Sequence, residues 1–149
     1  MKLEGYTFQY ESEATLCFDP GKGTKHYDPY WAILKWDEEV ANYYRWLLRR
    51  YGQDTDIPNR LWGFHISVIK GETPSKNLDQ WGKLDGTRVK FNYGNYISYS
   101  NGRHAWINIF SEALSDIREF YGLNVCNRKL KYHATLGRLK NPWEPDVKR

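Results

Sequence analysis

Two short stretches, FHISV at Phe64–Val68 and YHATL at Tyr132–Leu136, decide how this chain is interpreted. Each alternates apolar residues with a histidine and a hydroxyl residue, which is the pattern of a half-buried β-strand. Alternate side chains of a strand point to opposite faces, so each histidine shares a face with the hydroxyl two positions later. The four residues presented in this way, called the quartet below, are His65, Ser67, His133 and Thr135.

An internal repeat surrounds the two stretches. The first half predicts a strand at 30–36, a capped amphipathic helix and a stop at Gly52. The second half predicts a strand at 103–110, another capped helix and a stop at Gly122. Each helix ends in a Tyr-Gly pair, and a loop then enters a histidine-bearing strand. The expected N-caps are Asp37 and Ser111.

Further strands are predicted outside the repeat. Residues 6–10 and 14–18 indicate a hairpin added at one edge. Residues 89–93 and 96–99 indicate a second hairpin, and Asn-Gly at 101–102 is a turn signal before the next strand.

With both motifs and the repeat in view, the chain resembles the two-histidine (2H) phosphoesterase superfamily. That family carries a pair of His-apolar-Ser/Thr-apolar motifs in pseudo-symmetric halves, matched here by 65–68 and 133–136. The resemblance covers about 30–140, because the order of strand and helix also agrees. The chain is compact for the group and is similar in size to its phage members of the anti-CBASS type, which destroy immune cyclic nucleotides.

The resemblance implies an α+β fold. We expect two pseudo-symmetric lobes, each an antiparallel sheet with a packed helix, flanking a central groove. The lobes are expected at about 27–75 and 88–141 of a single domain over 1–149, with an irregular tail at 142–149.

The chemistry expected of the quartet is phosphodiester cleavage next to a ribose 2′-OH, in a cyclic oligonucleotide signal or a small RNA. One imidazole accepts a proton and the other donates one, since the ordinary pKa of histidine lies near neutrality. The two hydroxyls suit the phosphoryl oxygens as neutral donors. We expect no metal and no cofactor, because zinc prefers three or four ligands from His, Cys, Asp or Glu.

Other functions compete with the prediction of phosphodiester cleavage. One alternative is an RNA-end processing enzyme, a 2′,3′-cyclic phosphodiesterase or 2′-5′ RNA ligase-like protein. Another is a non-catalytic nucleotide- or RNA-binding module, against which the two complete motifs argue. A Ser-His-Asp hydrolase is disfavoured because each hydroxyl points in parallel with its own histidine.

Weaker candidates for substrate contact are cations, one further histidine and aromatic residues of the kind that stack on a base. For each of them, a solvated surface position or core packing is the competing interpretation. These candidates are Tyr6, Tyr30, Trp62, Lys70, His104, Trp106, Lys131, Arg138, Lys140 and Trp143.

Composition sets the remaining limits. The net charge of +4 is a mild bias toward anionic partners such as a nucleotide or RNA phosphodiester, and 17% of residues are aromatic. Cys17 and Cys126 have no CxxC or zinc-type partner, which predicts reduced thiols. The first residues lack the apolar core of a signal peptide, and no apolar run is long enough to span a membrane. We therefore expect a cytoplasmic protein, in the host cytoplasm if the chain is phage-encoded.

Overall fold

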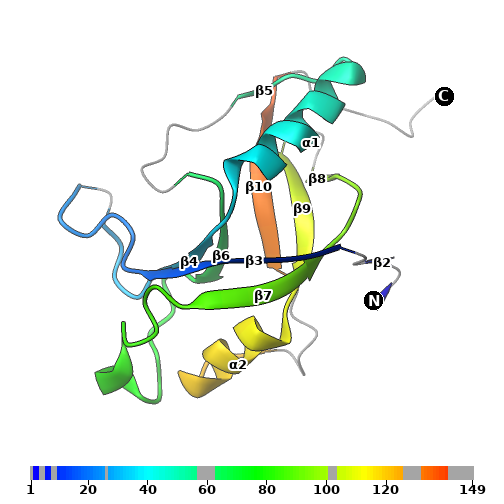
Figure 1. Ribbon diagram of the computed structural model, residues 1–149. Coiled ribbons are helices and arrows are strands. Elements are labelled where there is room, and N and C mark those ends of the chain that lie inside the picture. Colours follow the sequence, from blue (N-terminus) through cyan, green and yellow to red (C-terminus); the bar gives the residue numbers. More distant parts are fainter. Residues whose placement is uncertain are drawn as a thin grey trace.

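A computed structural model provides the structure of the chain (Figure 1). The residues that it describes are 2–3, 6–7, 10–25, 27–56, 63–100, 104–125 and 132–140, with the side chains of 2–3, 6–7 and 100 left aside. Within this part, no helix is both long and apolar enough to cross a membrane.

Six antiparallel strands close into a barrel in the spatial order β10-β6-β4-β3-β7-β9, and β9 returns to β10. The shorter β5 (Thr55–Asp56) pairs with β10, and β8 (Ser98–Ser100) pairs with β9. A separate pair is formed by β1 (Lys2–Leu3) and β2 (Tyr6–Thr7). The barrel strands are β3 (Tyr10–Phe18), β4 (Ala32–Lys35), β6 (His65–Ile69), β7 (Arg88–Tyr93), β9 (His104–Phe110) and β10 (Tyr132–Leu139).

The expected pair of helix-packed lobes is wrong. The lobes predicted at 27–75 and 88–141 do not form separate sheets, because β6 pairs with β10 and β3 pairs with β7 across the two halves. These two pairings use the sheet edges that separate lobes would have left open. Among the described residues, one closed barrel with two α-helices takes the place of the two lobes.

The two predicted helices are present. The first, α1 (Glu38–Arg50), begins after Asp37, whose carboxylate accepts the N–H of Glu39. The second, α2 (Glu112–Phe120), begins after Ser111, whose hydroxyl accepts the N–H of Leu114. Both helices end before a Tyr-Gly pair with the glycine at positive φ, as expected of a C′ residue. In Figure 1, α1 and α2 lie on opposite sides of the strands, and a 3₁₀ turn (Leu78–Gln80) precedes β7.

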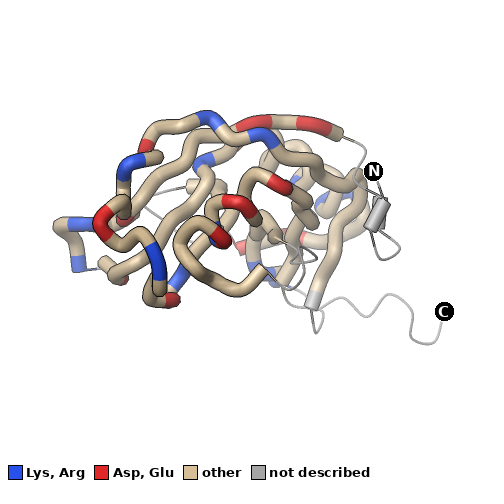
Figure 2. Tube along the Cα trace, turned by 90° about the horizontal axis from the view of Figure 1, so that it is seen from below, with Lys and Arg blue, Asp and Glu red and all other residues tan. Residues whose placement is uncertain are grey.

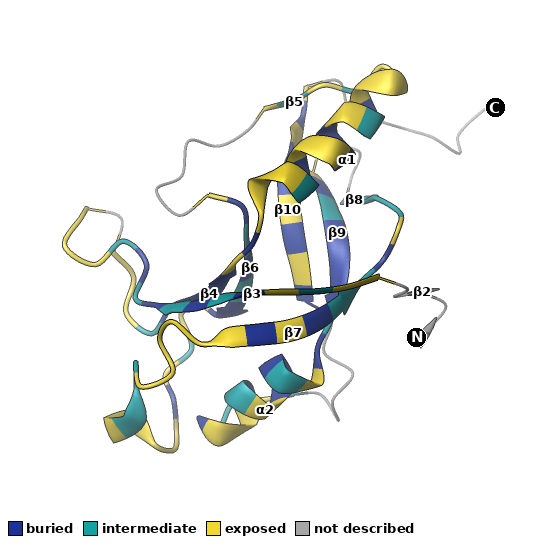
Figure 3. Cartoon of the chain, in the orientation of Figure 1, coloured by how far each residue is buried: buried dark blue, intermediate teal, exposed yellow. Residues whose placement is uncertain are grey.

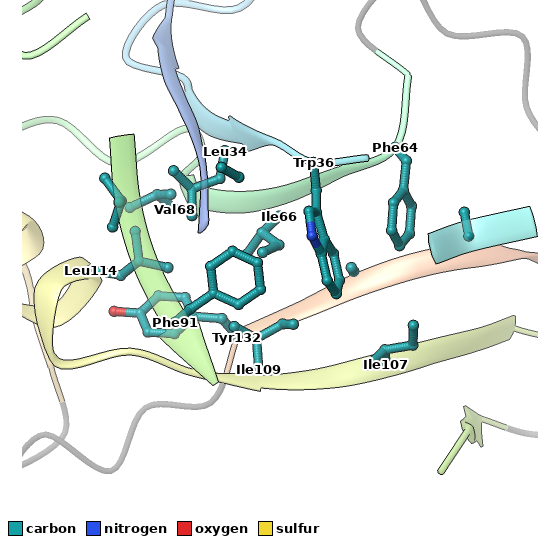
Figure 4. Close-up of a cluster of buried hydrophobic side chains, with 14 of the residues drawn as sticks. Leu34, Trp36, Phe64, Ile66, Val68, Phe91, Ile107, Ile109, Leu114 and Tyr132 are labelled. Carbon is teal, nitrogen blue, oxygen red and sulfur yellow. The ribbon is translucent and has the colours of Figure 1, made fainter. Parts of the chain in front are cut away.

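The core fills the barrel from both halves. Buried and exposed residues alternate along β10 and β7, as Figure 3 shows. The inward side chains meet residues from α1 and α2 in one apolar cluster, part of which is drawn in Figure 4. Trp36 stacks on Phe64 with ring centroids 5.2 Å apart and meets Phe91 edge-on at 4.8 Å. Packing of this kind fixes the outward faces of β6 and β10 in space.

Two expected hairpins are also wrong. Residues 10–18 form one long strand of the barrel wall, between β4 and β7. They are not the second arm of an edge hairpin. The strands β7 and β8 pair with β9 and not with each other. The turn predicted at 101–102 lies outside the described residues.

The internal repeat is visible in the topology. The series β3, β4, α1, β6 corresponds to β7, β9, α2, β10, and the pairings of one series match those of the other. From α1, Arg45 donates through Nε to the Leu136 carbonyl at 2.8 Å; from α2, Arg118 donates through Nη1 to the Val68 carbonyl at 2.8 Å. Each acceptor lies three residues after a quartet histidine, in the opposite half. We call this pair of contacts the arginine clasp.

Candidate functional site

The quartet gathers on the outward face of two neighbouring strands. Ile66 of β6 faces Ala134 of β10, and both point into the core. In an antiparallel ladder this register sets His65 opposite Thr135 and Ser67 opposite His133. Directly opposed side chains have Cβ atoms about 4.5–5.5 Å apart, and diagonal ones, such as the two histidines, about 7–8 Å. Two imidazoles at that separation can lie on either side of one tetrahedral anion.

The strands on either side extend this face with different side chains. On the β6 side, β4 places Lys35 opposite His65. On the β10 side, β9 places Trp106 opposite Thr135 and Asn108 opposite His133. The fold is pseudo-symmetric, but the flanks of the site are not: a cation borders one histidine, and an indole and an amide border the other.

The ring of His65 is held from behind. Its Nδ1 lies 2.7 Å from the carbonyl oxygen of Gly63, which has no proton to give, so Nδ1 is the donor. Gly63 has a φ of 64°, a conformation that favours glycine. Glu38 of α1 accepts the N–H of Phe64 at 2.5 Å and fixes the entry to the strand. In the neutral ring, Nδ1 is therefore the nitrogen that carries the proton.

The ring of His133 is held from the side. Its centroid lies 6.1 Å from that of Trp106, edge to face. The indole Nε1 donates to Asn108 Oδ1 at 3.1 Å, and Asn108 Nδ2 donates to Ser98 Oγ at 2.7 Å. Asn108 is only 6% exposed, so the indole is oriented by a hydrogen bond to a buried amide. Desolvation of the ring lowers the pKa of His133 from its ordinary value of 6.5.

The weaker candidates divide into those near the quartet and those elsewhere. Trp106 lies beside it, whereas Tyr30 packs edge-on against Trp81 at 5.5 Å in an aromatic cluster around Tyr121. The ammonium of Lys70 lies 4.8 Å from the ring centroid of Trp31, just after β6 ends. Tyr30 and Lys70 therefore have structural partners away from the outward face of the quartet.

The remaining described candidates lie toward the far end of β10. Arg138 is exposed, opposite His104 on one side and Asp56 on the other. Lys140 Nζ lies 3.9 Å from Asp56 Oδ1. The bulge in β10 between Thr135 and Gly137 separates this end from the quartet. The other candidates, namely the Tyr6 side chain, Trp62, Lys131 and Trp143, lie outside the described part, as does Cys126.

Sequence reasoning missed three residues that border the quartet, namely Lys35, Asn108 and Glu38. Strand parity already places Lys35 on the outward face, since Leu34 points inward. Which strand lies beside β4 is a long-range property, and the pairing with His65 follows only from the fold. The role of Glu38 has no local signal, because acidic residues are common in the first turn of a helix.

Outside the quartet, the described residues carry charges of both signs and no group of three metal-ligand side chains. Lys and Arg are interspersed with Asp and Glu along the described trace, as Figure 2 shows. Among the described residues, no three side chains from His, Cys, Asp and Glu are grouped as metal ligands would be. The quartet thus offers two imidazoles and two hydroxyls, a donor set better suited to an anion than to zinc.

Comparison with known proteins adds no assignment. No family model, curated protein or solved structure matches this chain, and the resemblance to the 2H phosphoesterases accordingly remains a prediction from its motifs and repeat.

Proposed function

We propose that this protein is a metal-independent phosphodiesterase that cleaves a phosphodiester next to a ribose 2′-OH. The observation that carries the proposal is the register of Ile66 with Ala134, which gathers the quartet on one outward face. A cyclic oligonucleotide signal or a small RNA is the substrate class, as the resemblance to compact 2H proteins implies.

The proposed reaction has three requirements, and the quartet matches each. One imidazole removes the proton from the 2′-OH, whose oxygen attacks the adjacent phosphorus. The other imidazole protonates the oxygen that leaves. Ser67 and Thr135 each stand opposite a histidine and donate to the non-bridging oxygens, where negative charge develops. Rigid strands hold all four groups, so little reorganisation accompanies the reaction.

The test is cleavage of cyclic and linear oligoribonucleotides at neutral pH in the presence of EDTA. We expect His65→Ala and His133→Ala to lower kcat/KM by about 10²–10⁴-fold each, as for a general acid or base. Ser67→Ala and Thr135→Ala should cost less, and Thr24→Ala, which removes an exposed loop hydroxyl, should change nothing. Full activity of either histidine variant, with an unchanged thermal transition, would contradict the proposal.

Two further outcomes separate the alternatives. Activity that EDTA removes and zinc or manganese restores would replace the acid–base pair with a metal site. Cleavage confined to 2′,3′-cyclic phosphate ends would favour RNA-end processing over an internal linkage. An all-deoxy linkage lacks the internal nucleophile, and we expect it to survive.

A further inference from the structure

We infer that the site holds its substrate in one direction only, with the nucleoside that carries the attacking 2′-OH against Trp106 and His133, and the departing nucleotide against His65 and Lys35. This makes His133 the general base and His65 the general acid. The inference rests on the proposed function and adds the substrate polarity.

The Trp106 side is built for a base. The indole is fixed by its hydrogen bond to Asn108 and by the edge contact with His133, so a base that stacks on it loses little side-chain entropy. Trp106 faces Thr135 directly across the ladder. A ribose attached to a base stacked there lies over Thr135 and His133, and its 2′-OH is then next to the His133 ring.

The His133 environment suits a base catalyst. The ring borders an indole and a buried amide, with no carboxylate opposite it in the ladder. Desolvation lowers the pKa of this ring, which favours the neutral form that accepts a proton.

The His65 environment suits an acid catalyst. Its Nδ1–H is bound to the Gly63 carbonyl, and the Glu38 carboxylate lies directly behind that backbone. Lys35 lies across the ladder from this ring. Because Nδ1 already donates to the Gly63 carbonyl, a proton that this ring gives to the substrate comes from Nε2.

Space for the departing nucleotide lies beyond Lys35, in a cavity that no quartet residue lines. Lys35 lines an open cavity of about 730 Å³ bounded by β3, β4, β7 and the start of α1. Three carboxylates, from Glu11, Glu13 and Asp37, share its lining, but Arg88 binds Glu13 at 3.2 Å and Asp37 caps α1. Lys35 is thus the cation nearest to His65 in the ladder, and it suits a further phosphate on the departing side.

The atoms balance in one step. The His133 ring takes the 2′ proton, the 2′ oxygen forms a bond to phosphorus, the bond from phosphorus to O5′ breaks, and His65 Nε2 gives its proton to O5′. The products are a 2′,3′-cyclic phosphate and a free 5′-hydroxyl. The two imidazoles exchange protonation states and are reset by solvent.

A bridging sulfur tests the assignment. In a diribonucleotide whose 5′ oxygen is replaced by sulfur, the leaving thiolate needs no acid. We expect His65→Ala to regain at least about 10²-fold in kcat relative to its rate on the oxygen substrate, the lower end of the acid contribution, and His133→Ala to regain none. Rescue of His133→Ala instead, or of both variants equally, would overturn the polarity. If the wild type cleaves neither substrate, the proposed function itself fails.

An abasic substitution tests the base side independently of the histidines. Trp106→Ala should raise KM about 10-fold for an intact diribonucleotide, in line with a stacking contribution of about 1–3 kcal/mol per base. With an abasic ribose on the 2′-OH side, this penalty should vanish; with an abasic residue on the departing side, it should persist. Trp106→Phe should restore most of the binding. The opposite dependence on the abasic position would overturn the inference while leaving the phosphodiesterase activity intact.

Discussion

Replacing Arg118 by methionine tests the best-anchored contact between a helix and a strand of the quartet. Arg118 is 6% exposed and donates to the carbonyls of Val68 and Asn124 and, through two nitrogens, to both carboxylate oxygens of Glu72 at 2.8 and 2.7 Å. Methionine keeps the apolar stem and removes every one of these donors. The Val68 carbonyl and the Glu72 carboxylate then lose their partner.

The expected cost follows from the burial of each partner. Breaking a buried ion pair by removing one member costs about 3–5 kcal/mol. The Glu72 side chain is 42% exposed and regains water, which places Arg118→Met at the lower end, about 3 kcal/mol. For a chain of this size, that loss lowers Tm by about 6–12 °C. Thermal and urea unfolding measure this loss of stability. The control is Arg49→Met at an exposed position, whose free energy of unfolding should stay within about 0.5 kcal/mol of the wild type.

The same pair makes a pH-dependent contribution. The hydrogen bond from Arg118 holds the pKa of Glu72 below its ordinary value of 4.5, so its stabilisation is full above that range and is lost as the pH falls through the folded-state pKa. As the pH falls through this acidic window, the wild type should lose its advantage in free energy of unfolding over Arg118→Met. The difference in stability between the two proteins should therefore narrow. A loss below about 1 kcal/mol at pH 7, or a gap that does not narrow in acid, would refute this account of the contact.

Two other expectations follow from the structure. The helix stops Gly52 and Gly122 share a positive φ, but a Cβ on Gly52 meets nothing within 4 Å, whereas one on Gly122 collides with Ser75 Oγ and lies 3.2 Å from Lys76 N. Gly52→Ala should thus cost about 1–2 kcal/mol and Gly122→Ala at least about 1 kcal/mol more, by urea unfolding; equal costs would contradict the packing around α2. Because desolvation lowers the pKa of His133, the acidic limb of the kcat/KM profile should lie below pH 6.5, and a limb above that value would exclude His133 as the base.

Local signals predicted the elements, and long-range pairing decided how they assemble. Asp37 and Ser111 were predictable as N-caps, since a polar residue before an amphipathic run is a local signal. The shared face of each histidine and its hydroxyl was predictable for the same reason, because strand parity is local. That β6 and β10 are neighbours is a choice among many possible edges, and the sequence patterns of the two strands do not encode it.

The errors have the same origin. The presence of an aromatic residue such as Tyr30 does not distinguish a base-stacking surface from a packed core. Its partner in the structure, Trp81, lies 51 positions away in the sequence. The expected two-lobe fold and the observed barrel contain the same strands and helices of the repeat. They differ in whether β3 pairs with β7 and β6 pairs with β10. Each of these contacts joins residues far apart in the chain, so propensity and periodicity carry no information about it.

The arginine clasp makes each half of the chain depend on the other. Arg45 finds its acceptor in the second half, and Arg118 finds its acceptor in the first. One repeat alone would expose the pairing edges of both its outer strands and leave its helix arginine without the carbonyl that it binds. Two identical repeats related by a twofold axis satisfy both needs at once, since each offers the other what it lacks. Under this symmetry Asn108 stands in the second half where Lys35 stands in the first, each opposite a quartet histidine. Trp106 likewise stands where Ile33 does, each opposite a quartet hydroxyl, so the two halves differ at both positions beside the quartet.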